Sequence, residues 1–285
     1  MAGGRILPAR GRTAMPSETT RTIAVTGVAG GIGAELAALL KSRGHRVIGF
    51  DLRDTSQNID GFVPLDLADM TSVRAAAAAV EEPLDGLCNN AGLPPRDGLE
   101  AMLLQVNFLG TRAFTDLLRP KISGGGSIVN VASRAGAQWR QNLDQVLRLG
   151  ALSDAAQLPE FITREGIDPT RAYNLSKEAV IAWTAALTEE MIGRDIRINS
   201  ISPGAVTTGI LDDFARAFGD KMVRNVERAG RPGTPREVAE VAAFLLSPES
   251  GWIKGVDIAI DGGMGGFNMS DMLGLEAMKQ AGQTA

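Results

Sequence analysis

The chain has 285 residues, of which 44% are hydrophobic and 22% are charged, and 33 acidic against 29 basic residues leave a net charge of −4. This composition excludes a collagenous, coiled-coil or wholly disordered chain, and the lack of a basic cluster beyond the N-terminal tail argues against a nucleic-acid partner. The single histidine, His45, and the single cysteine, Cys88, provide no disulfide and no Cys/His metal site, so we expect both to be structural.

Residues 1–20 contain three arginines and several glycines and prolines but no apolar stretch, which predicts a disordered tail rather than a secretory signal. A transit peptide, or a start at Met15 that makes the tail dispensable, are the alternatives. No apolar run approaches the roughly 18 residues that a bilayer-spanning helix needs. We therefore expect a soluble, cytoplasmic protein with no membrane partner.

From residue 21 onward, short runs rich in β-branched residues alternate with longer stretches of helical periodicity. We expect strands at Thr22–Thr26, Arg46–Asp51, Gly61–Leu65, Leu84–Asn89, Ser127–Ala132, Arg197–Ile201 and Val256–Ile260. We expect helices at Gly31–Arg43, Thr71–Val80, Leu99–Leu118, Thr170–Ile192 and Pro235–Leu246. This alternation predicts an α/β fold in one domain over residues 21–263, a doubly wound sheet of seven parallel strands with helices on both faces.

Two segments do not follow the alternation. Residues 138–169 carry apolar side chains at a spacing of mostly three to four, which predicts an insertion of one or two amphipathic helices. Residues 264–285 contain four of the ten methionines, whose side chains adapt to irregular apolar shapes.

The first strand leads into Thr26-Gly27-Val28-Ala29-Gly30-Gly31-Ile32-Gly33 and then into a helix. Glycines let the backbone approach a pyrophosphate, and the helix N-terminus holds its negative charge. Asp51 ends the second strand, eighteen residues after Gly33, where a carboxylate accepts hydrogen bonds from both ribose hydroxyls and repels the 2'-phosphate of NADP. These residues predict NAD as the cofactor in preference to NADP, although Arg53 is a second group that can receive that phosphate.

Tyr173, the only tyrosine, and Lys177 lie four residues apart on a predicted helix and so share one face. A free phenol has a pKa near 10 and is a poor base at neutral pH, but a neighbouring ammonium and a positive nicotinamide ring favour the phenolate. Tyr173 can then act as a proton acceptor beside a bound cofactor.

Further motifs follow in order along the chain: Asp66-Leu67, Asn89-Asn90-Ala91-Gly92, Asn107, Ser133, Tyr173 with Lys177 as YxxxK, and Pro203-Gly204 with Thr208 as PGxxxT. With the glycine pattern TGxxxGxG, they make the chain from Arg21 to Gly263 resemble the classical short-chain dehydrogenase/reductase family. The resemblance implies a Rossmann fold and a nicotinamide dinucleotide site formed by Gly27, Ala29, Gly31, Ile32, Gly33, Asp51, Leu52, Asp66, Leu67, Asn90, Ala91, Gly92, Tyr173, Lys177, Pro203, Gly204, Val206 and Thr208.

The resemblance also implies a catalytic set of Asn107, Ser133, Tyr173 and Lys177, without a metal. In it, Ser133 hydrogen-bonds the substrate oxygen, Lys177 also holds the nicotinamide ribose, and Asn107 helps to hold a water that links Lys177 to solvent.

The spacing departs from the ordinary family pattern, because 40 residues separate Ser133 from Tyr173. With the short path from Asp51 to Asp66, this is similar to the branch that contains bacterial 3α-hydroxysteroid dehydrogenase/carbonyl reductase, which implies a bulky apolar secondary alcohol or ketone. We expect residues 138–169 and the methionine-rich segment 264–285 to form an apolar lid over the nicotinamide. The alternative is that the insertion remodels the helix surface through which family members associate, with a homodimer and a homotetramer both open.

The sequence thus predicts an NAD-dependent oxidoreductase that interconverts a small hydrophobic alcohol, such as a 3α-hydroxysteroid, with its ketone. The alternatives are a dehydrogenase or reductase of an aryl alcohol, a sugar or a carrier-bound 3-oxoacyl group, and a non-catalytic dinucleotide sensor. Asp51 argues against a biosynthetic 3-oxoacyl reductase, since such enzymes usually use NADPH. The complete catalytic set argues against a sensor, which has no need of a serine and a phenol at a reacting oxygen.

Overall fold

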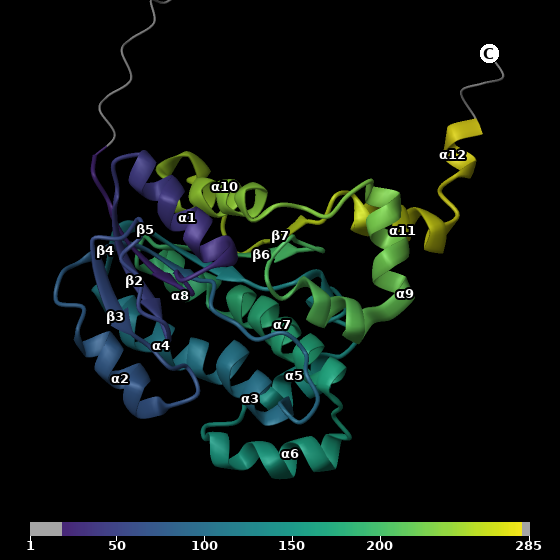
Figure 1. Cartoon of the computed structure of the whole chain (residues 1–285), viewed down its shortest axis with the longest axis horizontal. Coiled ribbons are helices and arrows are strands. Elements are labelled where there is room, and N and C mark those ends of the chain that lie inside the picture. The colour runs from purple at the N-terminus through teal and green to yellow at the C-terminus, as the bar shows by residue number, and fades with distance from the viewer. Residues whose placement is uncertain (1–18, 281–285) are drawn as a thin grey trace, which may run out of the picture.

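A computed structural model describes residues 19–280, which form a parallel sheet flanked by helices (Figure 1). The seven strands are β1 (Thr22–Thr26), β2 (Arg46–Asp51), β3 (Gly61–Pro64), β4 (Leu84–Asn89), β5 (Ile122–Val131), β6 (Arg197–Pro203) and β7 (Asp257–Ile260). They lie in the order β3-β2-β1-β4-β5-β6-β7, and every neighbouring pair is parallel. The predicted fold class is therefore confirmed.

Helices cover both faces of the sheet. They are α1 (Gly31–Ser42), α2 (Met70–Ala78), α3 (Glu100–Leu104), α4 (Thr111–Leu118), α5 (Leu143–Gly150), α6 (Leu158–Glu165), α7 (Pro169–Ala186), α8 (Thr188–Gly193), α9 (Leu211–Ala229), α10 (Pro235–Leu246), α11 (Met264–Leu273) and α12 (Ala277–Gln280). Short 3₁₀ turns lie at Arg119–Lys121, Arg134–Gly136, Ala155–Gln157 and Pro248–Ser250. No helix among residues 19–280 has the length and apolar character needed to cross a membrane.

Side chains alternate between two cores along each strand, as a sheet buried on both faces requires. In β1, Ile23 and Val25 pack with α1 and α10, whereas Ala24 between them packs with α2 and α4. Cys88 belongs to the first of these cores and is fully buried, as a small apolar residue of a central strand should be. His45 accepts a hydrogen bond from the Arg21 N–H (3.4 Å), in keeping with its predicted structural role.

The order of the strands places the functional region. From β1 the chain builds outward to β2 and β3 on one side, and from β4 it builds outward to β7 on the other. In open α/β sheets, ligands bind beyond the carboxyl ends of the strands at such a switch in direction. The predicted glycine-rich turn after β1 and the Asn90 motif after β4 both lie at this point.

Some predicted boundaries differ from the structure. The single helix expected at Leu99–Leu118 is divided by a π-helical turn at Gln105–Gly110, and the helix expected at Thr170–Ile192 is divided into α7 and α8. The sequence analysis assigned no helix to residues 211–229, where the structure has α9. Its apolar residues Leu211, Phe214, Phe218 and Met222 recur every three to four positions, so a helical signal is present in the sequence, although non-helical backbone at Gly219 (φ 52°, ψ −143°) interrupts α9.

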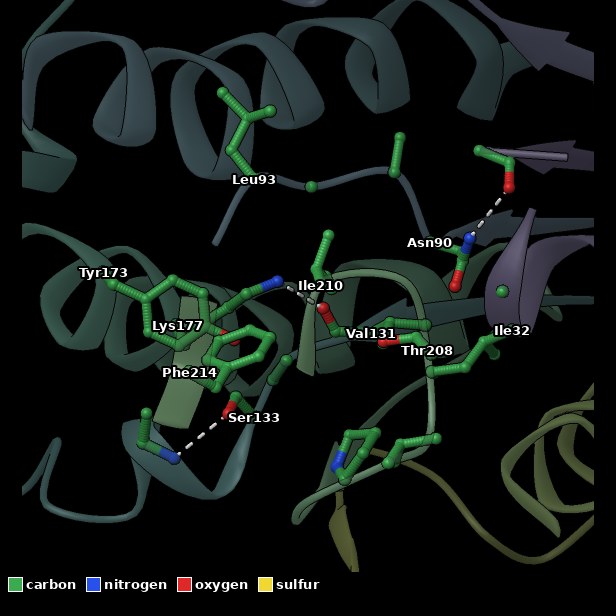
Figure 2. Close-up of a pocket in the computed structure, with 18 of the residues that line it drawn as sticks. Ile32, Asn90, Leu93, Val131, Ser133, Tyr173, Lys177, Thr208, Ile210 and Phe214 are labelled. Atoms are coloured by element: carbon green, nitrogen blue, oxygen red, sulfur yellow. Dashed lines mark hydrogen bonds between the residues drawn. The ribbon is translucent and has the colours of Figure 1, made fainter. Parts of the chain in front are cut away.

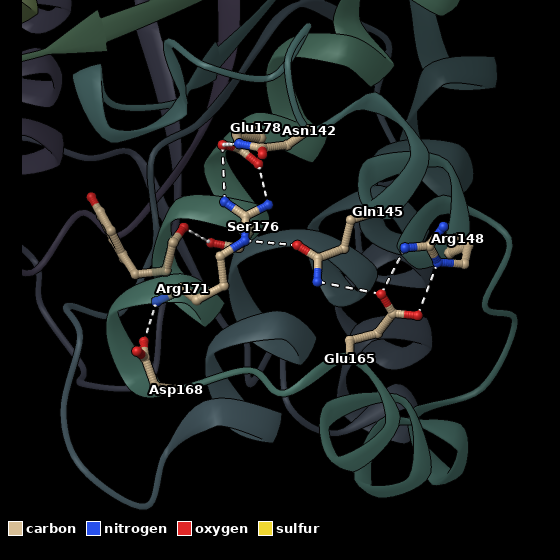
Figure 3. A network of polar contacts seen from close by, with 9 residues as sticks. Asn142, Gln145, Arg148, Glu165, Asp168, Arg171, Ser176 and Glu178 are labelled. Carbon is tan, nitrogen blue, oxygen red and sulfur yellow. Dashed lines mark hydrogen bonds and ion pairs between the residues drawn. The ribbon is translucent and has the colours of Figure 1, made fainter.

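The insertion forms two amphipathic helices, as predicted, and α5 packs on α7 while α6 packs on α3. A polar network joins them to α7 (Figure 3). Arg171 donates two hydrogen bonds to the carboxylate of Glu178 (3.0 and 2.6 Å), which also accepts one from Asn142 (2.7 Å). The Nε of Arg171 donates to Gln145 (2.7 Å), whose amide in turn contacts Glu165 (3.4 Å). The insertion is therefore tied to the helix that carries Tyr173 and Lys177.

The lid expected from residues 138–169 is not present, because Gln138 is their only member that lines the large cavity described below. In the other predicted lid segment, Met264 and Asn268 line the cavity, whereas Met269, Met272 and Met278 are exposed. The predicted N-terminal tail lies outside the described residues up to position 18, as do residues 281–285.

Candidate active site

A cavity of about 1400 Å³ lies at the carboxyl ends of the central strands. Its lining joins the glycine-rich turn, the ends of β2 and β4, the 3₁₀ turn after β5, α7 and the segment after β6. All but two of the predicted cofactor-binding and catalytic residues line it. The exceptions, Gly33 and Asn107, lie behind the residues that do.

The glycine-rich turn brings bare backbone to the cavity. Gly27 (φ +75°) and Gly31 (φ +54°) adopt left-handed conformations that favour glycine. A Cβ on Gly33 would lie 2.1 Å from the Gly27 carbonyl oxygen, so Gly33 allows α1 to pack against the turn rather than contacting a ligand itself. Because the first N–H groups of α1 point from the helix end toward the cavity, the turn suits a pyrophosphate.

Hydrogen bonds between Thr26 and Asn90, which the sequence analysis did not predict, fix this turn to the end of β4. The Thr26 hydroxyl accepts hydrogen bonds from the N–H groups of Asn90 (3.0 Å) and Ala91 (2.9 Å). The Asn90 amide donates in return to the carbonyl oxygens of Thr26 (3.0 Å) and Gly27 (3.3 Å). Asn90 therefore shapes the glycine-rich turn, and Thr26, the first residue of the TGxxxGxG pattern, belongs to the site although the sequence analysis gave it no role.

Asp51 lies where β2 ends, with its carboxylate held over the glycine-rich turn. Its two oxygens accept hydrogen bonds from the N–H groups of Ala29 and Arg53, both at 3.0 Å. The Arg53 guanidinium lies beside the same turn, 3.4 Å from the Ala29 carbonyl oxygen. An acid and a base thus flank one end of the cavity, as the spacing predicted, and Leu52 between them is 70% exposed on its rim.

Asp66 and Leu67 form another part of the cavity wall, after β3. The Asp66 carboxylate accepts a hydrogen bond from the Ala68 N–H (2.8 Å), and its backbone N–H donates to Ser72 (2.9 Å). The Leu67 carbonyl accepts a hydrogen bond from Gln105 (3.2 Å). These bonds give the wall a defined shape.

Tyr173 and Lys177 project from α7 into the cavity, and Ser133 approaches from the end of β5 (Figure 2). Asp168 caps α7 by accepting a hydrogen bond from the Arg171 N–H (2.6 Å), so the helix begins one turn before Tyr173. The Lys177 Nζ lies 5.9 Å from the centre of the Tyr173 ring and donates to the Val131 carbonyl oxygen (2.9 Å).

Burial dominates the electrostatics of this pair. It raises the pKa of Tyr173 to about 12, against the opposing effect of a hydrogen bond with Ser133. It also lowers the pKa of Lys177 to about 8, because a buried ammonium loses its hydration. In the protein alone the phenol therefore keeps its proton at neutral pH, and the neighbouring ammonium does not suffice to produce the expected phenolate.

Asn107 lies in the π-helical turn and faces the loop after β4. Its Oδ1 accepts a hydrogen bond from the Leu93 N–H (2.7 Å), and its Nδ2 donates to the Leu93 carbonyl (3.0 Å) and to Ser176 (3.3 Å). A Cβ on Gly92 would lie 3.1 Å from Oδ1 of Asn107 and 3.4 Å from Nζ of Lys177, so a larger residue there would press against the Asn107 side chain. Asn107 thus clamps this loop to α7 next to Lys177.

An apolar wall beside Tyr173 comes from α9, which the sequence analysis did not identify. The ring of Phe214 meets Tyr173 edge-on with 5.2 Å between ring centres, and Phe218 stacks on Phe214 with 16° between their planes. Arg96, in the loop after β4, forms an ion pair with the buried Asp213 of α9 (2.7 Å). The apolar wall is therefore tied to the opposite rim of the cavity.

These residues fit a nicotinamide dinucleotide. The turn around Gly27 leaves room for a diphosphate, Asp51 is placed to accept ribose hydroxyls, and Gly92 leaves room beside Lys177. Asn174, next to Tyr173, also lines the cavity and has a buried Oδ1 with no hydrogen-bond partner among the described residues, so a bound molecule can supply one.

Comparison with known proteins agrees with this geometry. Residues 21–143 match the family described as short chain dehydrogenase, and residues 160–265 match the one described as Enoyl-(Acyl carrier protein) reductase. The chain is 38% identical over 248 residues to coniferyl-alcohol dehydrogenase of Pseudomonas sp. strain HR199, covering 86% of this chain and 97% of that protein. It is 30% identical over 253 residues to 3-alpha-hydroxysteroid dehydrogenase/carbonyl reductase of Comamonas testosteroni, covering 85% and 95%.

Among solved structures, the chain resembles 3-alpha-hydroxysteroid dehydrogenase from Pseudomonas sp. B-0831 in complex with NADH. The TM-score is 0.75 and the sequence identity 34%, with 85% of this chain and 96% of that chain covered.

Proposed function

The chain belongs to the short-chain dehydrogenase/reductase family, and from that premise we propose that it is an NAD-dependent dehydrogenase of bulky apolar alcohols. The observation that carries the proposal is one cavity lined by the glycine-rich turn, Asp51, Ser133, Tyr173 and Lys177. A dinucleotide held at one end of this cavity extends toward a phenol, an ammonium and a serine hydroxyl at the other.

The preference for NAD over NADP rests on Asp51. Its carboxylate is held at the glycine-rich turn by two backbone N–H groups, which fix its position there. It accepts hydrogen bonds from ribose hydroxyls and repels a phosphate at the same position. The nearby Arg53 reduces this repulsion, and the structure related to this chain at 34% identity was solved with NADH.

In the proposed reaction, the alcohol oxygen binds between Ser133 and Tyr173. The cofactor, when bound, supplies the hydride acceptor and a positive charge beside the phenol. That charge adds to the Lys177 ammonium and lowers the pKa of Tyr173 from the high value that burial produces. Tyr173 then accepts the alcohol proton, Ser133 orients the oxygen, and Lys177 and the Asn107 clamp hold the site in position. Reduction of the carbonyl compound uses the same groups in reverse.

Two substrate classes have specific support. An aryl alcohol of the coniferyl type suits the aromatic wall formed by Phe214 and Phe218 beside Tyr173, and the 38% identical relative acts on coniferyl alcohol by its name. A 3α-hydroxysteroid is the second class, supported by the relatives at 30% and 34% identity. We place the aryl alcohol first because the observed wall is aromatic.

A non-catalytic sensor of dinucleotides remains the alternative of a different class. It gives no reason for the pairing of Ser133 and Tyr173 at an aromatic wall.

A homodimer is the proposed assembly, since α5 and α6 cover outer surfaces of α7 and α3. Light scattering that yields the mass of a tetramer would contradict it.

The test is the initial rate of NADH formation from NAD with coniferyl alcohol and with a 3α-hydroxysteroid, for the wild-type protein and Tyr173→Phe. We expect turnover of coniferyl alcohol and a loss of about 100-fold or more in the variant, since general acid–base catalysis contributes about that factor. NAD binding, followed by tryptophan fluorescence, should change little. Binding of NAD without oxidation of any alcohol would favour the sensor.

A further inference from the structure

The apolar wall of the cavity ends in an amide. Phe214, Phe218, Met222 and Asn225 follow one another along α9 at intervals of four, four and three residues, and all four line the cavity. This spacing puts them on one side of a helix, apart from the change of direction at Gly219. Phe214, the first of these residues, contacts Tyr173. The amide of Asn225 therefore lies at the other end of this row of side chains, away from the phenol.

Asn225 is nine-tenths buried, at 9% exposure, yet its amide makes no hydrogen bond with any residue in the range 19–280. The other buried asparagines in that range, Asn89, Asn107, Asn130 and Asn199, all donate hydrogen bonds within the protein. Neither amide atom of Asn225 is sealed from solvent, so both are reachable through the cavity. Because buried polar groups are nearly always paired, this amide is suited to a ligand.

The space between Tyr173 and Asn225 suits a flat ring. The near-parallel rings of Phe214 and Phe218 offer an aromatic surface, and the flexible side chains of Met222 and Met264 adapt to the shape of a bound molecule.

A positively charged side chain near Asn225 favours a ligand oxygen that carries partial or full negative charge. Lys221 lies four residues before Asn225 on α9 and lines the cavity from an exposed position. An amide offers both a donor and an acceptor, and a phenolic hydroxyl uses both, whereas a ketone oxygen uses only the donor.

We propose that Asn225 is a specificity-determining residue that hydrogen-bonds the phenolic hydroxyl of an aryl alcohol whose alcohol group reaches Ser133 and Tyr173. The inference rests on the proposed function and narrows its substrate to hydroxyaryl alcohols. Asn225 binds the substrate equally before and during the reaction, so its effect falls mainly on KM rather than on kcat.

The test compares 4-hydroxycinnamyl alcohol with cinnamyl alcohol, which lacks only the phenolic hydroxyl, in the presence of NAD. In the wild-type protein we expect kcat/KM to be at least about tenfold higher for the hydroxylated alcohol. Asn225→Leu, similar in size, should remove this preference by lowering kcat/KM for 4-hydroxycinnamyl alcohol about tenfold while leaving that for cinnamyl alcohol nearly unchanged. Asn268→Leu, the matched change at an exposed cavity position, should preserve the preference.

The rate with cinnamyl alcohol reports that Asn225→Leu is folded and active. Equal losses for the two alcohols in Asn225→Leu, or a preference that survives the substitution, would overturn the role of Asn225. Turnover of a hydroxysteroid but neither aryl alcohol would also overturn it, while leaving the dehydrogenase function in place. Failure of the wild-type protein to oxidise any of these alcohols would instead count against the proposed function itself.

Discussion

The ion pair between Arg171 and Glu178, both on α7, makes a sharp prediction about stability, because it forms the buried end of the polar network that joins α7 to α5 and α6 (Figure 3). Glu178 is 1% exposed and accepts three hydrogen bonds, two from Arg171 and one from Asn142. Glu178→Leu removes the two oxygens that accept all three bonds and leaves the guanidinium with only Gln145 as a partner on the network. Breaking a buried pair in this way costs about 3 to 5 kcal/mol.

The Arg171 side chain is 23% exposed, so water compensates part of the loss and the lower end of that range, about 3 kcal/mol, applies. Urea unfolding measures the change, and with a slope of about 3 kcal/mol per molar the midpoint should fall by about 1 M. The double variant Arg171→Met/Glu178→Leu should be more stable than Glu178→Leu alone, since it leaves no unpaired buried charge.

Glu165→Gln is the matched control in the same network. Its ion-pair partner Arg148 is 49% exposed, although the Glu165 side chain itself is 9% exposed, so water screens this pair more than the Arg171–Glu178 pair. Exposed pairs contribute only about 0 to 1 kcal/mol. A loss below about 1 kcal/mol in Glu178→Leu, or equal losses in the two single variants, would refute the reasoning that burial sets the strength of this contact.

Three further predictions concern the cofactor, the thiol and the pH profile. In steady-state kinetics with both cofactors, Asp51→Ser should raise KM for NAD and lower KM for NADP, because the carboxylate that repels the 2'-phosphate is gone and Arg53 remains. An unchanged ratio of the two KM values would show that Asp51 does not determine the cofactor preference. Burial raises the pKa of the Cys88 thiol to about 12, so iodoacetamide should label the native protein only on unfolding, and rapid native labelling would show that β4 opens. Because burial raises the pKa of Tyr173, kcat/KM for alcohol oxidation should rise with pH between about 6 and 9. The kcat/KM for carbonyl reduction should not rise, because reduction needs the protonated phenol. An oxidation rate that falls across this interval would exclude Tyr173 as the proton acceptor.

The features that the sequence predicted well are those set by neighbours along the chain. The strand, turn and helix around Gly27 and the single helical turn between Tyr173 and Lys177 follow from local spacing, and both are present. Alternating strands and helices determined a parallel sheet, and with right-handed crossovers they brought the turns after β1 and β4 together. The positions of Asp51 and Ser133 at strand ends follow from the same pattern.

The features that the sequence did not predict depend on residues remote in the chain. The apolar wall comes from α9, and its contact with Tyr173 exists only after folding, because the two segments are far apart in the chain. The insertion carried a clear helical pattern, but the pattern could not tell that α5 and α6 pack on α7 and α3 rather than over the cavity.

The sequence by itself determined the order of the elements and the kinds of groups at the site, because periodicity, turn chemistry and helix spacing act over a few residues. The tertiary structure alone decided the burial that raises the pKa of Tyr173, lowers that of Lys177 and leaves Asn225 without a partner. Burial and pairing are properties of a packed environment, to which segments far apart in the chain contribute, so no local pattern encodes them.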